Sequence, residues 1–502
     1  MFPKLNNFDK NKQNLQIQIY GQRLYADQTL YEYLLEFLLV FISPKGSNSI
    51  QNADDGFSFI VPENGENLTY FPSPRMGLKR FVFFERSEQE KRYNVDKDAL
   101  EAQRDLLKRK INLGSSLTNK DYVLDVIQDL FYGFNAVIGK RSWFAQSLLP
   151  VSPELIFCEA MGKKQKREKI EYKHDLIDVD KDFEFNGHVF MARGGEVYFL
   201  HIVQGLKEAP EFEKGIIEGL KSMVTSVPQL SILAEYIQKQ WQDFQYEDLS
   251  NDSEVDGIRF VKKDAKWIPK NYSKRAKNSV IELSNLLQSE LDPFEKIELV
   301  GKLIALQIIR MMCLQSSLVL SNDDQQEWLL DFTDDSKGSI RKMAVESYRQ
   351  VEENVFRAVH HADIESYKGD DANKDEMGIF NSALKDTSRL VRKLAKDINL
   401  LIPPKGANMR FSLDEELIKI LVVSLIEPGE RLLFSTFLEK CYEHFKIVIG
   451  PNESLKHFTE IQELDLGAFD SNEYIFQQLL KSCGYLRNLS DATSIVENPF
   501  KG

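Results

Sequence analysis

The chain contains little cysteine, and its four cysteines form no recognisable pattern. Cys158, Cys313, Cys441 and Cys483 lie far apart in 502 residues. No two of them have the close spacing of a zinc site, and a disulfide scaffold needs a higher density of cysteine. The sequence therefore predicts buried thiols in a reducing compartment, which indicates a cytoplasmic protein without a metal or any other cofactor.

A long uninterrupted apolar run is also absent. The two most apolar segments are 29–43, which is short, and 299–320, which is interrupted by Lys302 and Arg310. Spanning a bilayer takes roughly 20 predominantly apolar residues. The first residues, "MFPKLNNFDKNKQN", contain no apolar signal core. We therefore expect no export and no membrane contact.

The chain has no excess of basic charge. Its formal net charge is −13, with 42% hydrophobic and 28% charged residues. These values are typical of an ordinary soluble globular protein that is long enough for several domains. They exclude broad, nonspecific coating of nucleic acid, so any contact with nucleic acid must be local.

A complete nucleotide-binding or catalytic motif is missing. The stretch "YGFNAVIGKRSW" resembles a phosphate loop, but Gly133 and Gly139 are separated by five residues instead of four, and Ser142 stands one place too late. Helical spacing precedes the stretch where a strand is required. No nucleophile elbow or Ser/His/Asp signature is present either. The sequence thus favours a protein without an active site of its own.

The periodicity predicts a predominantly helical α+β fold with four domains. These are a small mixed α/β unit over 1–112, a helix plus a central β-hairpin over 113–208, a helical bundle over 209–402, and a winged-helix-like domain over 408–502. The predicted helices cover a segment from about Thr29 that Pro44 stops, 96–111, a segment from about 118, 211–224, 228–245, 279–291, 294–319, 340–362, 376–400, 413–427, 431–446 and 473–483. A terminal hairpin turning at Ser490 and Asp491 would supply the wing.

Three earlier segments are predicted to be strands. Alternation in "NLQIQIYGQRLY" indicates a hairpin turning near Gly21, and "GFSFIVP" and "KRFVFFER" indicate two short strands. The central hairpin would turn at residues 193–195 in "FMARGGEVYFLHIV". Its second strand is apolar on both faces, as in a buried strand of a sheet.

Two basic segments are candidates for contact with nucleic acid. The segment 262–277 interleaves two aromatic rings with basic side chains, which could stack on bases and follow the backbone. Its candidate residues are Lys262, Lys263, Lys266, Trp267, Lys270, Tyr272, Lys274 and Arg275. The segment 163–169 is a second basic patch. The alternative is that both are exposed loops, with the first docking on the acidic loops of the chain itself.

A degenerate nuclease site is a further hypothesis. Metal-dependent nucleases place one acid before a Glu-x-Lys strand, so that two carboxylates hold a metal ion and the lysine steadies the attacking water or the phosphate. Glu154 would be the early acid, followed by Glu171 and Lys173. The alternative is a solvated charged strand, because "KIEYK" lacks the apolar flanks of a core strand.

Three segments carry a resemblance to a known class of proteins. "KRSWFAQSLLPVSPELIFCEAMG", "FMARGGEVYFLHI" and "FKIVIGPNESL" resemble accessory subunits of bacterial multi-gene phage-defence or DNA-modification-dependent restriction systems. The resemblance covers about a fifth of the chain and includes no catalytic motif. It implies a non-catalytic partner of an ATPase or nuclease encoded beside it.

Two hypotheses of function result. The first is a non-catalytic scaffold or adaptor that binds partner proteins in a cytoplasmic assembly. The second is a nucleic-acid-binding protein or degenerate nuclease that uses the basic patches. From Ala407 to Gly502 the chain has nine Lys or Arg and fifteen Asp or Glu, a net charge of −6. A groove-reading helix normally lies in a basic surface, so this charge favours protein over DNA as the ligand of the last domain.

Overall fold

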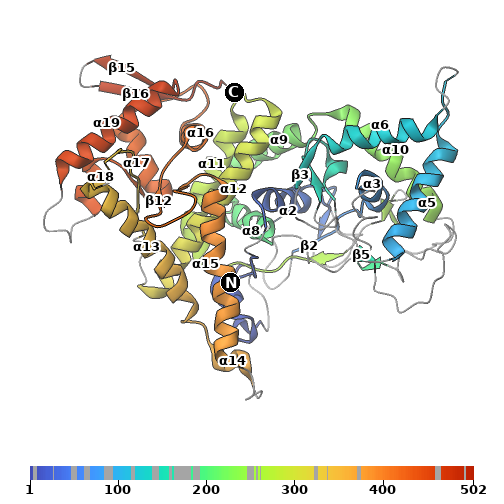
Figure 1. Cartoon of the computed structure of the whole chain (residues 1–502), viewed down its shortest axis with the longest axis horizontal. Coiled ribbons are helices and arrows are strands. Elements are labelled where there is room, and N and C mark those ends of the chain that lie inside the picture. Colours follow the sequence, from blue (N-terminus) through green and yellow to red (C-terminus); the bar gives the residue numbers. More distant parts are fainter. Residues whose placement is uncertain are drawn as a thin grey trace.

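The computed structural model describes most of the chain. Outside the described residues lie 4–7, 26–27, 47–53, 61–67, 84–93, 115–118, 138–145, 158–160, 163–182, 185–192, 246–253, 256–257, 260–261, 322–325, 336, 370–374, 458–464, 491–492 and 502. Helices predominate in the described part and its strands are short, so the predicted helical α+β fold is confirmed (Figure 1).

Helix α12 (Pro293–Leu320) runs through the core. Asp292 caps its start by accepting hydrogen bonds from the backbone N–H groups of Phe294 and Glu295, and every residue from Leu299 to Leu318 is buried. The helix is long and apolar enough to cross a membrane, but 89% of its most apolar window is buried inside the fold. Helix α12 is thus a core helix of the fold.

Helices α2 (Leu30–Ile42) and α11 (Ser273–Gln288) pack on either side of α8 (Gly194–Leu206), close to α12. The N-terminus of α2 has a capping box between Thr29 and Glu32, which satisfies backbone donors that a helix start leaves without partners. These helices join the first third of the chain to the bundle. One contiguous apolar core extends from Phe2 to Val496.

The central hairpin predicted at 193–195 is wrong, because α8 begins at Gly194. All thirteen residues of α8 are buried, and a helix buried on every side has the same continuous apolar pattern as a buried strand. The glycines permit close packing instead of a turn: a Cβ on Gly195 would lie 2.3 Å from the backbone nitrogen of Phe37. Oε2 of the Glu36 carboxyl group accepts a hydrogen bond from the backbone N–H of Gly195 at 2.9 Å.

The other early strand predictions are also wrong in the described residues. "NLQIQIY" forms helix α1 (Leu15–Tyr20), in which alternate glutamines are buried by bonding to backbone carbonyls. "KRFV" belongs to helix α3 (Met76–Val82), and the described part of "GFSFIVP", residues 56–60, contains no strand. In α1, backbone carbonyls outside the helix thus satisfy the buried amides of Gln16 and Gln18, so the alternation of polar and apolar residues does not mark a strand.

Helix α3 packs against three further helices at one end of the molecule. These are α5 (Asn94–Lys110), α6 (Lys120–Tyr132) and α10 (Pro228–Gln245). They lie on the right of Figure 1. The predicted helices over 96–111, from 118 and over 228–245 are confirmed.

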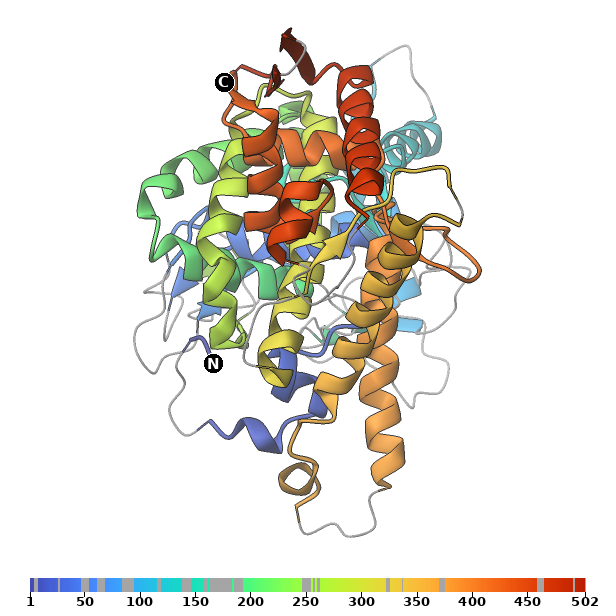
Figure 2. The same ribbon diagram turned by 90° about the vertical axis from the view of Figure 1, so that its left-hand side faces the viewer.

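The remaining bundle helices also match their predictions. They are α9 (Glu213–Val224), α13 (Ser339–Val359) and α15 (Glu376–Asp397), with the short α14 (Ile364–Lys368) between the last two. Helices α13 and α15 run side by side and project with α14 at their tip (Figure 2).

The last hundred residues alternate helices with strands. In chain order they form α16 (Glu415–Leu425), β13 (Arg431–Leu433), α17 (Phe434–Phe445), β14 (Ile447–Val448), α18 (Pro451–His457), α19 (Leu466–Ser482), β15 (Leu486–Ser490) and β16 (Thr493–Glu497). The terminal hairpin is confirmed, and β13 completes a sheet of order β13-β16-β15. The helix predicted over 431–446 therefore starts as a strand.

Short strands and 3-10 turns connect the helices. They are η1 (Lys10–Lys12), β1 (Lys45–Gly46), β2 (Thr69–Tyr70), β3 (Asn135–Val137), β4 (Ser147–Leu148), η4 (Pro153–Leu155), β5 (Met161–Gly162), β6 (Phe183–Glu184), η6 (Pro210–Phe212), β7 (Glu254–Val255), β8 (Ile258–Arg259), β9 (Lys263–Asp264), η7 (Lys270–Tyr272), β10 (Trp328–Leu329), β11 (Leu401–Ile402) and β12 (Arg410–Phe411). Strand β10 pairs in parallel with β14, which ties the bundle to the C-terminal elements.

Candidate functional site

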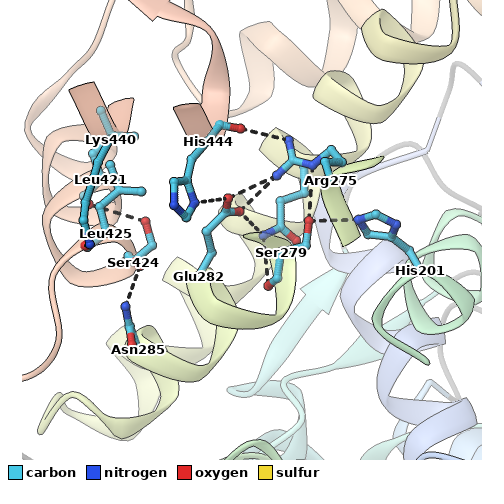
Figure 3. Close-up of polar contacts among 11 residues, drawn as sticks. His201, Arg275, Ser279, Glu282, Asn285, Leu421, Ser424, Leu425, Lys440 and His444 are labelled. Atoms are coloured by element: carbon cyan, nitrogen blue, oxygen red, sulfur yellow. Dashed lines mark hydrogen bonds and ion pairs between the residues drawn. The ribbon is translucent and has the colours of Figure 1, made fainter. Parts of the chain in front are cut away.

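A buried cluster of polar side chains lies where α11, α12, α8 and α17 meet (Figure 3). The guanidinium of Arg275 donates to both carboxylate oxygens of Glu282, at 3.2 and 3.1 Å. Nδ1 of His444, on α17, lies 2.9 Å from Oε1 of the same carboxylate. Gln307, on α12, donates to its other oxygen. Three side chains, from α11, α12 and α17, thus share the carboxylate of Glu282.

The two charges of this cluster are removed from water. The side chain of Glu282 is fully buried and that of Arg275 is nearly so. Desolvation of a buried ion pair offsets much of its attraction, so such a pair adds little net stability, yet removing one partner leaves an uncompensated buried charge. The cluster therefore fixes how the C-terminal elements dock on α11.

His201 and Ser279 form a pair that resembles part of a catalytic dyad. Nε2 of His201 lies 2.8 Å from Oγ of Ser279, which also accepts a hydrogen bond from Nε of Arg275. Burial, reinforced by the charge of Arg275, lowers the pKa of His201 well below its usual value, so the ring is neutral. Both side chains are fully buried, and Nδ1 has no hydrogen-bond partner among the described residues. Among the described residues the pair thus has no orienting acid, and both side chains lie inside the core.

The nuclease candidates are placed only in part. Glu154 lies in η4 and is buried, and it accepts hydrogen bonds from the hydroxyls of Ser152 and Ser231. Glu171 and Lys173 lie outside the described residues, so the metal-site hypothesis stays a prediction. Within the described part of the chain, no group of three or more His, Cys, Asp and Glu side chains could hold a metal ion.

The basic patch at 262–277 does not form one continuous face. Exposed positions are Lys262, Lys270 and Lys274, whereas Lys266 and Trp267 are half-buried and Lys263, Tyr272 and Arg275 are buried. The buried Tyr272 is surrounded by core groups that hold its pKa well above the usual value, chiefly through desolvation. Neither Tyr272 nor Arg275 can contact a nucleic-acid strand in this conformation. The other basic patch, 163–169, lies outside the described residues.

Large apolar side chains are exposed at one end of the molecule, on α6. Tyr122, Val126 and Leu130 are spaced four residues apart and are 61%, 49% and 49% exposed. Only Leu124 and Phe131 of this helix are fully buried. The sequence contains the signal for this surface, because α6 carries apolar residues around most of its circumference. The sequence does not identify this surface, however, because periodicity alone does not tell an inward face from an outward one.

A second group of exposed apolar side chains lies at the opposite end of the long axis, on the C-terminal elements (Figure 1). Tyr474 on α19 and Leu489 on β15 are both 62% exposed. Asp470 and Lys481, on the same face of α19 as Tyr474, contribute opposite charges. This face is therefore close to neutral and has an aromatic ring near its centre.

Most basic side chains of the C-terminal elements are already occupied within the chain. Arg410 pairs with Asp331, Lys419 with Glu295, Lys456 with Glu439 and Arg487 with Glu497. Lys440 donates to the backbone carbonyl of Leu425. A DNA-binding surface would instead leave such groups available for phosphates.

No protein-family model, no curated protein and no solved structure matches the chain.

Proposed function

We propose that the chain is a non-catalytic scaffold or adaptor subunit of a cytoplasmic multi-protein assembly. The observation that supports this most is the exposure of large apolar side chains on α6 and on α19 and β15, at opposite ends of the long axis (Figure 1). Clustered exposed apolar groups are typical of protein–protein contacts. Among the described residues, the polar cluster around Glu282 and the His201–Ser279 pair contain residue types that can be catalytic, but both are buried in the fold.

The C-terminal elements support a protein-binding winged-helix-like domain. The order α16, β13, α17, α19 and hairpin β15–β16 agrees with such a domain, with β14 and α18 as an insertion between α17 and α19, and the sheet order β13-β16-β15 fits it. Helix α19 then takes the place of the recognition helix, with Tyr474 on its outer face. Tyrosine is enriched at protein interfaces, and the occupied lysines and arginines oppose binding to phosphates.

The expected partner is an ATPase or nuclease. This follows from the resemblance to accessory subunits of bacterial phage-defence and restriction systems, which act beside such enzymes. A chain with two separate contact surfaces could hold two components of an assembly at a fixed distance, because a rigid core joins the surfaces.

Nucleic-acid binding is the second candidate, and one observation favours it. Burial lowers the pKa of the N-terminal amine, and the positive charges of Lys10 and of the exposed Lys270 lower it further, so both lysines lie near that amine. Lys207 lies above the nearby ring of Phe2. This basic cluster could contact a phosphate backbone, and Lys274 extends it along α11.

Purification of the tagged chain from its native source, with and without nuclease treatment, separates the two candidates. The adaptor function predicts a protein partner at constant stoichiometry that survives nuclease and carries no nucleic acid. The second candidate predicts bound nucleic acid that dissociates with rising salt and with the charge reversals Lys262→Glu, Lys270→Glu and Lys274→Glu. That second result, without a stoichiometric protein partner, would refute the adaptor function.

A further inference from the structure

The exposed half of α6 is divided lengthwise into an apolar and an acidic side. Successive helical residues are about 100° apart, so Tyr122, Val126 and Leu130 form one row. Asp125 and Asp129 form another row beside it, and both are exposed. A helix that only had to pack on α3 and α5 would need a single apolar side. The apolar row faces outward and contributes little to the packing of the fold.

The apolar row continues beyond the end of the helix. Phe134 lies four residues after Leu130, and its ring stacks on that of Phe294 at the start of α12, with centroids 6.3 Å apart and an interplanar angle of 25°. Phe294 is itself 44% exposed. From Tyr122 to Leu130 the helix rises about 12 Å. The stacked pair Phe134–Phe294 follows after the C-terminal end of α6. A partner helix of about twelve residues would match this length.

Charge at the edges of the row selects the partner. Asp121 is held by Lys108, 2.6 Å away on α5, and Asp125 by Arg104. Asp129 has no ion pair within the part of the chain that the structure describes, and it stands beside Val126 and Leu130. At the far end, the exposed Asp292 precedes Phe294 by two residues. The row therefore ends in carboxylates that a basic partner could neutralise.

We propose that this row on α6, extended by Phe134 and Phe294, binds an amphipathic helix of a partner protein whose apolar face is flanked by lysine or arginine. Apolar side chains at every third or fourth position of that helix would cover Tyr122, Val126 and Leu130, and its basic residues would pair with Asp129 and Asp292. The proposal rests on the adaptor function and specifies the chemistry of one of its partners.

Two other occupants fit the charges less well. An anionic membrane surface attracts lysine and arginine, whereas the polar side of α6 is acidic. A second copy of the chain, packed antiparallel through α6, would place each row of aspartates beside the same row of its neighbour, and like charges at close range are unfavourable.

Three synthetic helix-stabilised peptides test the proposal, each fourteen residues long with leucine at every third or fourth position. They differ only in whether lysine, glutamine or glutamate flanks the leucines. Binding to the full chain is measured by fluorescence anisotropy. The lysine peptide should bind about tenfold more tightly than the glutamine peptide, and the glutamate peptide should bind most weakly.

The double variant Val126→Gln/Leu130→Gln should weaken binding of the lysine peptide at least about tenfold. Asp129→Asn should reduce the preference for lysine over glutamine.

Ile232→Gln is the matched control, because Ile232 on α10 is 71% exposed but lies outside the row. It should leave binding unchanged. The proposal would be overturned if no peptide bound, or if the three peptides bound equally well. It would also be overturned if the double variant bound the lysine peptide as tightly as the wild type does. Light scattering that shows a dimer for the wild type and a monomer for the double variant would overturn it in favour of self-association. A partner that still copurifies from the native source in any of these cases would leave the adaptor function intact and remove only this assignment.

Discussion

At the scale of the residue, neighbouring side chains in one basic segment have opposite roles. Lys274 and Lys277 are exposed, whereas Arg275 between them is buried and bonded to Glu282, two helical turns further along α11. The sequence shows a run of positive charge and cannot show which member points inward. Glu282 and His444 are 162 positions apart, so only the tertiary fold brings them together. Composition predicts a basic patch over 262–277, and packing exposes some of its basic side chains and buries others.

Removing the charge of Glu282 should destabilise the protein strongly. In Glu282→Gln, Arg275 stays buried without its counter-ion, and breaking a buried pair in this way costs about 3–5 kcal/mol. Thermal unfolding followed by circular dichroism would show the loss as a lower midpoint. Arg349→Gln removes an exposed pair with Glu346 and should change stability by at most about 1 kcal/mol. Equal midpoints for the two variants would contradict a structural role for the cluster.

Glu36 should make stability depend on pH. Burial, and the charge of Glu196, raise the pKa of Glu36 to about 8 from an ordinary 4.5. The folded state then holds a proton that the unfolded state has lost, so this contribution is fully present below pH 4.5 and declines as pH rises to 8. Between pH 5 and pH 8, the thermal midpoint of the wild type should therefore fall relative to that of Glu36→Gln. A difference that stays constant over this range would show that Glu36 is ionised throughout.

At the scale of the element, the long helices and α2 could be predicted, whereas α1, α3 and α8 could not. The helices of the bundle match their predicted ranges because each has several turns with one apolar side. Helix α8 has no polar side, so its pattern is equally that of a buried strand, and its two initial glycines imitate a hairpin turn. In the structure these two glycines leave room for Tyr33 and Phe37 of α2 to pack closely.

Gly195→Ala tests this role of the glycine. The added Cβ would meet backbone atoms of Tyr33 and Phe37 at 2.3 Å, and a backbone cannot move aside as a flexible side chain can. We expect a loss of about 3 kcal/mol from overpacking, measured as a lower midpoint of thermal unfolding. Gly467→Ala is the control at the second position of α19, where the nearest atom lies 3.7 Å away. It should leave the midpoint unchanged or raise it, since alanine favours helix more than glycine does. If Gly195→Ala were equally harmless, α2 and α8 would not be as closely packed as described.

At the scale of the whole molecule, the sequence predicts the fold class and not the places where function resides. Apolar content and helical periods indicate a helical bundle with a terminal hairpin. The outward direction of Tyr122 and Tyr474 depends on how α6 and α19 pack on their neighbours, which is a property of the assembled core. The same assembly buries Tyr272 and Arg275, which the sequence placed in a contact surface. A scaffold with one surface at each end is consistent with both observations.

Quantitative mass spectrometry of material purified from the native source tests this claim most directly. The wild-type chain would be compared with the double variant Val126→Gln/Leu130→Gln and with Tyr474→Ser, whose side chain is exposed on α19. The scaffold account predicts that each variant loses a different partner and retains the other, because the two surfaces are far apart. Partner profiles identical to that of the wild type for both variants would contradict it.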